Sequence, residues 1–176
     1  MNLAELTRKI TGDDRPVFIV AVGLPGSGKT TFINKLVSSL TGNDRIVTVA
    51  STDDLIEVEA GRLGLNYSQA FHRVDFKQIQ AEFTKIISNG VAANTDVIID
   101  RTSVGPKTRR TMLNLASNDY RKIALVFSVL DDVLKSRLKT RADATGKFIP
   151  DSVIDVMSKA YVAPTQAEGF DDVWDV

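Results

Sequence analysis

Gly23-Leu24-Pro25-Gly26-Ser27-Gly28-Lys29-Thr30 matches the Walker A pattern G-x-x-x-x-G-K-[ST]. An apolar run at residues 17–22 precedes this phosphate loop and is short enough to be a buried strand. Residues 30–40 follow with apolar side chains on one helical face. A strand, a glycine-rich loop and a helix in this order bring backbone N–H groups and the positive end of a helix dipole to a phosphate group. The loop therefore predicts that the chain binds a nucleoside triphosphate.

Individual residues of the phosphate loop have expected roles. The Lys29 ammonium should reach the β- and γ-phosphates, and the Thr30 hydroxyl should bind Mg²⁺. ATP with Mg²⁺ is therefore the expected pair of ligands, and another nucleoside triphosphate is the alternative donor. The residues expected to bind the nucleotide are Gly23, Pro25, Gly26, Ser27, Gly28, Lys29, Thr30 and Thr31.

The composition is that of an ordinary globular protein and argues against several classes of function. The chain of 176 residues has 22 basic and 22 acidic side chains, so a basic DNA-coating surface is not expected, although a local patch could still grip a nucleic-acid end. The absence of cysteine and the single histidine argue against disulfides and zinc sites. No apolar run approaches the ~20 residues of a membrane span, and residues 1–10 lack a signal-peptide core. We expect a cytoplasmic protein without a membrane partner; its oligomeric state stays open.

Two acidic residues are expected at the carboxyl ends of strands, where ligands bind in open α/β sheets. The run at residues 46–50 ends at Ser51-Thr52-Asp53-Asp54, and Asp53 is the candidate that accepts a proton from an attacking hydroxyl or holds it in line. The alternative is that this segment only caps the next helix. The apolar strand at residues 96–100 ends in Asp100, which is typical of a Walker B acid that orients Mg²⁺ or its waters.

Predicted strands alternate with predicted helices along the chain. The strands are expected at residues 17–22, 46–50, 96–100, 123–129 and 173–176. One long helix is expected from Ser68 to about Ser88. The alternation predicts an α/β fold of the P-loop NTPase or kinase type, in which helices flank a parallel sheet. We expect residues 1–176 to form a single kinase domain, with an N-terminal helix and turn at residues 1–15.

A basic helix follows the fourth predicted strand. Arg137 and Arg141 lie four residues apart and share one helical face, and a polar turn at residues 142–148 precedes another helix. Such an arrangement over about residues 131–150 is typical of the lid of a small kinase, in which arginines neutralise charge on the transferring phosphoryl group. An exposed basic helix is the alternative interpretation.

Further basic residues follow Asp100. Arg101 comes directly after the acid, and Arg109 and Arg110 lie in a helix that begins at Pro106. They could bind the phosphates of an acceptor, or they could form a solvated face. The sequence favours neither interpretation.

Together these motifs resemble those of the P-loop 5′-polynucleotide kinases of phage and of nucleic-acid end-repair enzymes. Ser51-Thr52-Asp53-Asp54 falls where that family has Asn-Arg-Asp-x, which implies that Asp53 is the general base. Asp100-Arg101-Thr102-Ser103 is similar to the strand end D-x-T-N of the family. The Arg-rich helix start and the two lid arginines of the family correspond to Arg109, Arg110, Arg137 and Arg141. The tail from Tyr161 to Asp171 looks like the P-T-x-x-E-G-F tail of end-repair kinases, so the resemblance extends from Val17 onward.

The sequence departs from the family pattern on the acceptor side. Thr52 replaces an arginine, Ile56 occupies the position of an acceptor-binding arginine, and Ser103 replaces an asparagine. Arg101 stands where phage members can have an acid. The resemblance still implies transfer of the γ-phosphate of ATP to a hydroxyl group. Its expected partner is a nucleic-acid end, with the 5′-OH of DNA or RNA as acceptor, or a nucleotide-like acceptor.

Two other functions stay open. A P-loop kinase for a different hydroxyl, on a nucleoside, a hydroxymethylated base in DNA, a sugar or a tRNA-linked amino acid, would explain the lost arginines. An ATP-binding switch or partner-binding module would hydrolyse ATP slowly without an acceptor. A GTPase is disfavoured, because the sequence has no N-K-x-D signal and no D-x-x-G after a strand.

Overall fold

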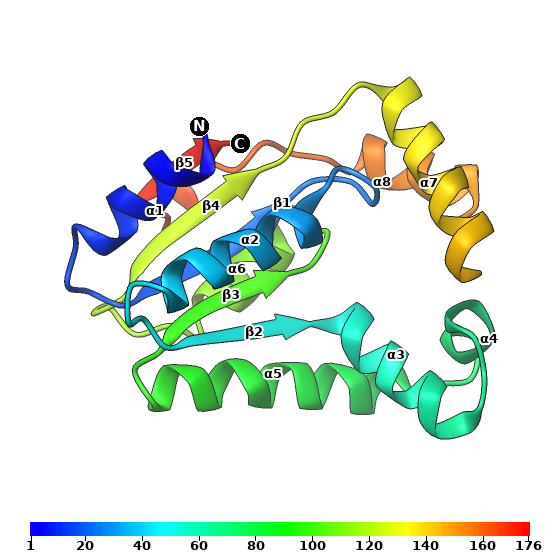
Figure 1. Ribbon diagram of the computed structural model, residues 1–176, viewed down its shortest axis with the longest axis horizontal. Helices are drawn as coiled ribbons and strands as arrows, with labels where there is room; N and C mark the ends of the chain where they lie inside the picture. The colour runs from blue at the N-terminus through cyan, green and yellow to red at the C-terminus, as the bar shows by residue number, and fades with distance from the viewer.

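The protein has one sheet of five strands, each parallel to its neighbours, in the spatial order β2-β3-β1-β4-β5 (Figure 1). The computed structural model describes all 176 residues. The strands are β1 (Val17–Val22), β2 (Val47–Ser51), β3 (Asp96–Asp100), β4 (Arg121–Val126) and β5 (Asp172–Asp175). The α/β fold of the P-loop NTPase and kinase type is therefore confirmed.

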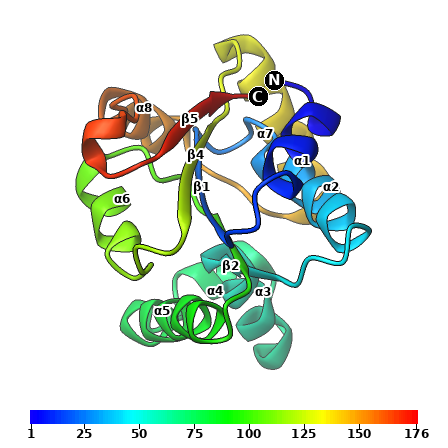
Figure 2. The same cartoon turned by 90° about the vertical axis from the view of Figure 1, so that its left-hand side faces the viewer.

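Helices cover both faces of the sheet (Figure 2). α1 (Leu3–Thr11) and α2 (Lys29–Thr41) pack on one face, and α5 (Phe76–Ala92) and α6 (Pro106–Leu113) pack on the other. Four helices lie beyond the carboxyl ends of the strands, namely α3 (Thr52–Leu63), α4 (Tyr67–Phe71), α7 (Asp131–Thr145) and α8 (Asp151–Lys159). A 3-10 turn, η1 (Gln166–Glu168), precedes β5. None of the helices combines the length and the hydropathy that a membrane crossing needs.

The sheet divides the core into two clusters, because side chains alternate between the two faces of each strand. Phe18, Val20 and Val22 of β1 pack with α5 and α6. Val17, Ile19 and Ala21 of the same strand pack with α1 and α2. All six residues of β1 are buried, so the phosphate loop leaves the sheet from a strand that is fixed on both faces.

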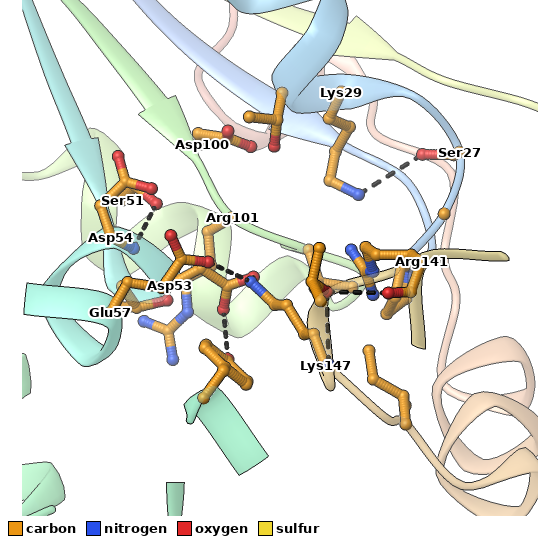
Figure 3. Close-up of a pocket in the computed structure, with 18 of the residues that line it drawn as sticks. Ser27, Lys29, Ser51, Asp53, Asp54, Glu57, Asp100, Arg101, Arg141 and Lys147 are labelled. Atoms are coloured by element: carbon orange, nitrogen blue, oxygen red, sulfur yellow. Dashed lines mark hydrogen bonds and ion pairs between the residues drawn. The ribbon is translucent and has the colours of Figure 1, made fainter. Parts of the chain in front are cut away.

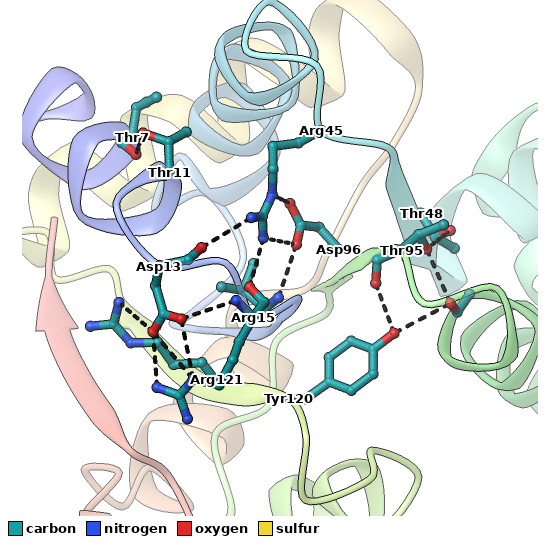
Figure 4. A network of polar contacts seen from close by, with 12 residues as sticks. Thr7, Thr11, Asp13, Arg15, Arg45, Thr48, Thr95, Asp96, Tyr120 and Arg121 are labelled. Atoms are coloured by element: carbon teal, nitrogen blue, oxygen red, sulfur yellow. Dashed lines mark hydrogen bonds and ion pairs between the residues drawn. The ribbon is translucent and has the colours of Figure 1, made fainter.

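A polar network closes the end of the sheet at which the strands begin (Figure 4). The Asp96 carboxylate accepts hydrogen bonds from the Arg45 guanidinium at 2.6 and 2.8 Å and from the Val17 N–H at 2.9 Å. The Arg121 guanidinium, at the start of β4, lies 2.8 Å from the Asp172 carboxylate at the start of β5. These pairs hold the starts of the strands together. The cleft described below lies at the opposite edge of the sheet, where the strands end.

The boundaries of two elements differ from the sequence-based expectation. The long helix expected from Ser68 to about Ser88 is wrong, because the chain forms α4 and α5 with residues 72–75 between them. The Asp75 side chain accepts a hydrogen bond from the Lys77 N–H and caps α5, which gives this segment a local alternative to a continuous helix. The strand expected at residues 123–129 lies at Arg121–Val126. The remaining predicted strands agree to within one residue at each end.

Candidate active site

A cleft of about 1640 Å³ lies beyond the carboxyl ends of the central strands (Figure 3). The phosphate loop, the first turn of α3, α4, α7 and residues 145–150 form its walls. Most of the residues predicted for the site line this cleft, namely Pro25, Gly26, Ser27, Gly28, Lys29, Thr30, Thr31, Asp53, Asp100, Arg101, Arg137 and Arg141. This edge is where ligands bind in open α/β sheets.

The conformation of the phosphate loop depends on its glycines. Gly26 and Gly28 have φ angles of +84° and +98°, which residues with a Cβ rarely adopt. Gly28 is also the N-cap of α2, so the unpaired N–H groups of the first helical turn are available to an anion. Gly23 does not line the cleft; a Cβ there would lie 2.7 Å from the Phe127 carbonyl oxygen. Gly23 therefore allows the loop to approach the end of β4 closely.

Lys29 lies among oxygen atoms of the phosphate loop. Its Nζ donates hydrogen bonds to the carbonyl oxygens of Gly23 at 2.9 Å and Leu24 at 2.8 Å. Burial lowers the pKa of Lys29 from its usual 10.5 to about 8, although the carboxylates of Asp100 and Asp53 oppose this shift. The buried cation is a group whose charge a phosphate would stabilise.

Thr30 and Asp100 form a second polar group at the base of the cleft. Burial raises the pKa of Asp100, while the neighbouring Thr30 side chain and the charge of Lys29 act in the opposite direction. A hydroxyl and one carboxylate are the hard oxygen ligands that Mg²⁺ takes when phosphates and waters supply the rest. No group of three or more His, Cys, Asp or Glu side chains that could hold a metal ion is present. These residues therefore fit Mg²⁺.

Asp53 projects into the cleft from the first turn of α3. Ser51 is the N-cap of this helix, and its side chain accepts a hydrogen bond from the Asp54 N–H. The capping function that was the alternative for this segment thus falls on Ser51. Asp53 Oδ1 accepts a hydrogen bond from the Tyr67 hydroxyl at 2.8 Å, and Oδ2 lies 2.7 Å from Lys147 Nζ (Figure 3).

The charge state of Asp53 follows from these contacts. Partial burial alone would raise the pKa of Asp53, but the bonds from Lys147 and Tyr67 and the charge of Arg141 together hold it below its usual value. The side chain is still 51% exposed, so one side of the carboxylate is open to a ligand. An ionised carboxylate in this position can accept the proton of an approaching hydroxyl.

The two arginines predicted to belong to a lid differ in their contacts. Arg137 reaches the phosphate loop, since its Nη1 lies 3.5 Å from the Gly26 carbonyl oxygen. Arg141 has buried Nε and Nη2 atoms without a hydrogen-bond partner. Because a buried, unpaired donor is costly, the Arg141 guanidinium fits a site that takes an anionic group such as a phosphate.

The three basic residues expected to bind the acceptor lie in different surroundings. Arg109 is completely buried; its Nη2 and Nε lie 2.7 and 2.8 Å from the Glu168 carboxylate, and its Nη1 donates to the carbonyl oxygens of Ser103 and Val104. Arg110 is exposed and lies outside the cleft. The acceptor assignment is wrong for Arg109, because its guanidinium is completely buried and its hydrogen bonds go to protein atoms. The assignment of the exposed Arg110 stays a prediction. Arg101 does line the cleft.

Sequence reasoning missed Lys147 and Tyr67, both of which contact Asp53. Lys147 falls in the polar turn predicted at residues 142–148, and Tyr67 begins α4. Neither position has a motif of its own. A lysine that follows Gly146 was the available signal, but only the folded chain brings it to Asp53.

A smaller cavity of about 330 Å³ continues from Asp53 between α3, α5 and residues 101–105. Phe71 and Phe76 line it with 41% and 48% of their surface exposed, and their ring centroids are 5.0 Å apart. Arg101 also lines this cavity; its guanidinium donates a hydrogen bond to the Gln80 side chain at 3.0 Å. Exposed aromatic rings beside a cation offer a surface on which a planar group can stack.

Solved structures share this fold at low sequence identity. The protein named "putative kinase" from Chloroflexus aurantiacus J-10-fl has a TM-score of 0.67 and 19% identity, over 92% of this chain and 84% of that one. Kti12 of Chaetomium thermophilum, solved with ADP-AlF3, gives a TM-score of 0.62 and 16% identity over 90% and 87% of the two chains. A chain of a Pnkp1/Rnl/Hen1 complex gives a TM-score of 0.54 and 20% identity. The match covers 70% of this chain and 39% of that one. These likenesses show the fold alone.

A protein-family model adds evidence from the sequence itself. The model, described as an AAA domain, matches residues 18–164 and so includes the phosphate loop, Asp53, Asp100, Arg137 and Arg141. The match covers most of the chain, and nucleotide binding through the P-loop follows from it. The chain therefore belongs to the AAA domain family, in its P-loop kinase-like form.

Proposed function

We propose that this protein transfers the γ-phosphate of ATP to a hydroxyl group, and that its acceptor is the 5′-OH end of DNA or RNA. The observation that carries the proposal is the presence of Asp53 and Lys29 on the walls of one cleft. A nucleotide-binding switch needs the phosphate loop, but it does not need a carboxylate held ready by two donors opposite that loop.

Each part of the cleft has a role in the proposed reaction. The phosphate loop and Lys29 hold the β- and γ-phosphates. Thr30 and Asp100 would hold Mg²⁺, which would neutralise charge on the phosphates. The acceptor hydroxyl attacks the γ-phosphorus while the bond to the β-phosphate oxygen breaks, and ADP leaves. The hydroxyl proton passes to Asp53. Arg137 and Arg141 stabilise the charge that spreads over the transferring group.

We assign the lid to residues 131–150. Leu134 and Leu138 pack against Ile154 and Leu24, so the lid is attached to the phosphate loop through an apolar contact. Closure of such a segment excludes water and completes the site around the phosphoryl group. In this proposal residues 1–176 act as one kinase domain, and the N-terminal helix and turn at residues 1–15 have no part in the chemistry.

The acceptor side supports a nucleotide-like substrate. The cavity beside Asp53 is lined by the exposed rings of Phe71 and Phe76 and by Arg101. A terminal nucleobase could stack on an aromatic ring while its 5′-OH reaches the carboxylate, and stacking of this kind contributes about 1–3 kcal/mol per base. Arg109 is bonded within the protein, which leaves one phosphate contact fewer for a long strand and favours recognition of a terminal residue.

A panel of acceptors tests the proposal. Wild-type protein and the Lys29→Ala variant are incubated with ATP labelled in its γ-phosphate and with 5′-OH DNA, 5′-OH RNA, nucleosides, DNA with hydroxymethylated bases, and sugars. Label on the 5′-OH oligonucleotides, and none with Lys29→Ala, supports the proposal. Label only on a nucleoside, a modified base or a sugar would overturn the 5′-OH acceptor, but it would still support transfer of the γ-phosphate to a hydroxyl.

A kinase for a different hydroxyl acceptor is the second candidate. It is favoured by one observation: Ile56, at the position where the resemblance implies an acceptor-binding arginine, is buried and lines the smaller cavity. An apolar side chain there suits a compact acceptor better than the phosphate of a second nucleotide.

A further inference from the structure

Lys147 differs from the other charged residues of the lid. It is 8% exposed, whereas the remaining acidic and basic side chains of residues 131–150 are exposed or half-buried. Burial of an ammonium group is unfavourable unless the charge is paired. Lys147 is therefore the buried cation of the lid, and its partners must compensate for its lost hydration.

The partners of Lys147 belong to the acceptor side of the cleft. Its Nζ lies 2.7 Å from Asp53 Oδ2, 3.2 Å from Glu57 Oε1 and 3.9 Å from the centre of the Tyr67 ring. The Tyr67 hydroxyl in turn donates to Asp53 Oδ1. One lysine thus joins the lid, α3 and α4, and both oxygens of the proposed base are fixed by donors (Figure 3).

The backbone around Lys147 is held in the same place. The Ser68 hydroxyl donates to the Gly146 carbonyl oxygen at 2.7 Å and accepts a hydrogen bond from the Phe148 N–H at 3.1 Å. Gly146 has a φ of +70°, which turns the chain out of α7 and directs the next residue inward. The contact with Asp53 is therefore supported on both sides of Lys147 and does not depend on one flexible side chain.

We propose that Lys147 is a positioning residue that couples closure of the lid to the orientation and ionisation of Asp53. This inference rests on the proposed function, in which Asp53 is the base. Each carboxylate oxygen has two acceptor sites. With one site on each oxygen taken by Lys147 or Tyr67, the carboxylate is fixed in orientation and still has room for the acceptor hydroxyl.

Pairing with a cation makes Asp53 a weaker base, but this cost is small in phosphoryl transfer. The transition state is loose, so orientation of the attacking hydroxyl matters more than strong proton abstraction. The lysine also keeps the carboxylate ionised in a partly buried site that would otherwise favour the neutral acid. Other charged or titratable groups around the Asp53 carboxylate are Lys29, Asp54, Glu57, Tyr67, Asp100, Arg101 and Arg141.

The test uses the full chain and three variants: Lys147→Met, which keeps side-chain length without charge, Lys147→Arg, which keeps the charge, and Lys139→Met as the control. Lys139 lies in α7, is exposed and lines neither cavity. The measurements are kcat and KM for ATP and acceptor, the pH dependence of kcat/KM, and the titration of the Asp53 side-chain carboxyl by NMR. Thermal melts show whether each variant is folded.

We expect Lys147→Met to lower kcat about 10-fold or more while KM for ATP changes less than about twofold, since positioning of a base affects the chemical step. In Lys147→Met, the acidic limb of the pH profile of kcat/KM should move to higher pH, and the NMR titration of Asp53 should move in the same direction. Lys147→Arg should recover part of the lost kcat. Lys139→Met should match the wild type. An Asp53 titration that is unchanged in Lys147→Met, or a Lys147→Met variant as fast as the control, overturns the inference. Failure of the wild type to phosphorylate any acceptor overturns the proposed function instead, even if the titration moves.

Discussion

The Arg109 guanidinium and the Glu168 carboxylate form a two-pronged ion pair, with N–O distances of 2.7 and 2.8 Å, in the interior of the protein. Arg109 belongs to α6 and Glu168 to η1, so the pair fixes the C-terminal tail to the helix that follows β3. Two features that the resemblance to 5′-polynucleotide kinases identified separately, the arginine-rich helix and the tail, are thus two halves of one contact. Its role is structural.

Removal of one partner of this pair should destabilise the fold. Glu168→Gln leaves a buried guanidinium without its counterion, and we expect the free energy of unfolding to fall by about 3–5 kcal/mol. Arg109→Met should have a similar effect. Arg110→Met is the control, since this side chain is exposed, and it should change stability by less than about 0.5 kcal/mol. Urea unfolding measures all three; equal stability of Glu168→Gln and Arg110→Met would contradict the structural role.

The same pair predicts a pH dependence. Burial opposes ionisation of Glu168, but the bonds from Arg109 outweigh it and hold the pKa of this carboxyl below its usual 4.5. Its contribution to stability is therefore complete above pH 4.5 and is lost as the pH falls through the lower folded-state pKa. The difference in unfolding free energy between wild type and Glu168→Gln should be constant near neutral pH and narrow in acid. A constant difference down to acid unfolding would argue against the pair as its source.

Replacement of glycine by alanine should have opposite effects on stability in the phosphate loop and inside a helix. Gly26 has a φ of +84°, and a Cβ there would lie 3.0 Å from Leu138 Cγ of α7. Gly26→Ala should cost about 1–2 kcal/mol from the backbone alone and weaken ATP binding. Gly61 lies inside α3 with no atom within 4 Å of its Cβ position, so Gly61→Ala should stabilise by about 0.5–1 kcal/mol. Thermal melts that place the two variants in the opposite order would contradict this interpretation.

Asp100→Asn tests the proposed metal ligand. The substitution removes a charge from a buried position, so the melting temperature should stay the same or rise. Transfer should fall by about 10²-fold and need a higher Mg²⁺ concentration, because an amide is a poorer ligand for a hard cation than a carboxylate. A Mg²⁺ titration of the transfer rate makes the comparison. An unchanged Mg²⁺ requirement would remove Asp100 from the metal site.

Arg141→Ala should affect the rate and leave the fold intact. The buried Nε and Nη2 atoms of Arg141 have no protein partner, so their loss breaks no hydrogen bond. If they stabilise the transferring phosphoryl group, kcat should fall by about 10²-fold with little change in the free energy of unfolding. Steady-state kinetics measure kcat, and urea unfolding of the same preparation measures stability. A large loss of stability with a normal kcat would contradict the role of Arg141 in the lid.

The predictable part of the site came from local patterns. The phosphate loop, Asp53 and Asp100 each follow an apolar strand, and a parallel sheet brings such strand ends to one edge. The buried strands β1 and β3 could be located from the sequence because each is a short apolar run, which is also a local pattern. Arg137 and Arg141 needed only helical spacing.

The remaining features depend on contacts between distant segments. Arg109 is 59 residues from Glu168, and Lys147 is 90 residues from Glu57, so no local pattern distinguishes a buried counterion from a solvated charge. Helix periodicity also continued through residues 72–75, where the Asp75 cap divides α4 from α5. In each case a tertiary or capping contact decided the role of a residue whose type alone allowed several.

Transfer of labelled γ-phosphate to a 5′-OH oligonucleotide by wild type and by Asp53→Ala, at ATP concentrations that saturate both, tests the proposed phosphotransferase most directly. Asp53→Ala should bind ATP with a Kd within about twofold of wild type, since Asp53 lies opposite the phosphate loop, and should label the oligonucleotide at least about 100-fold more slowly. Labelling by Asp53→Ala at the wild-type rate, or no labelling of any hydroxyl by the wild type, would contradict it.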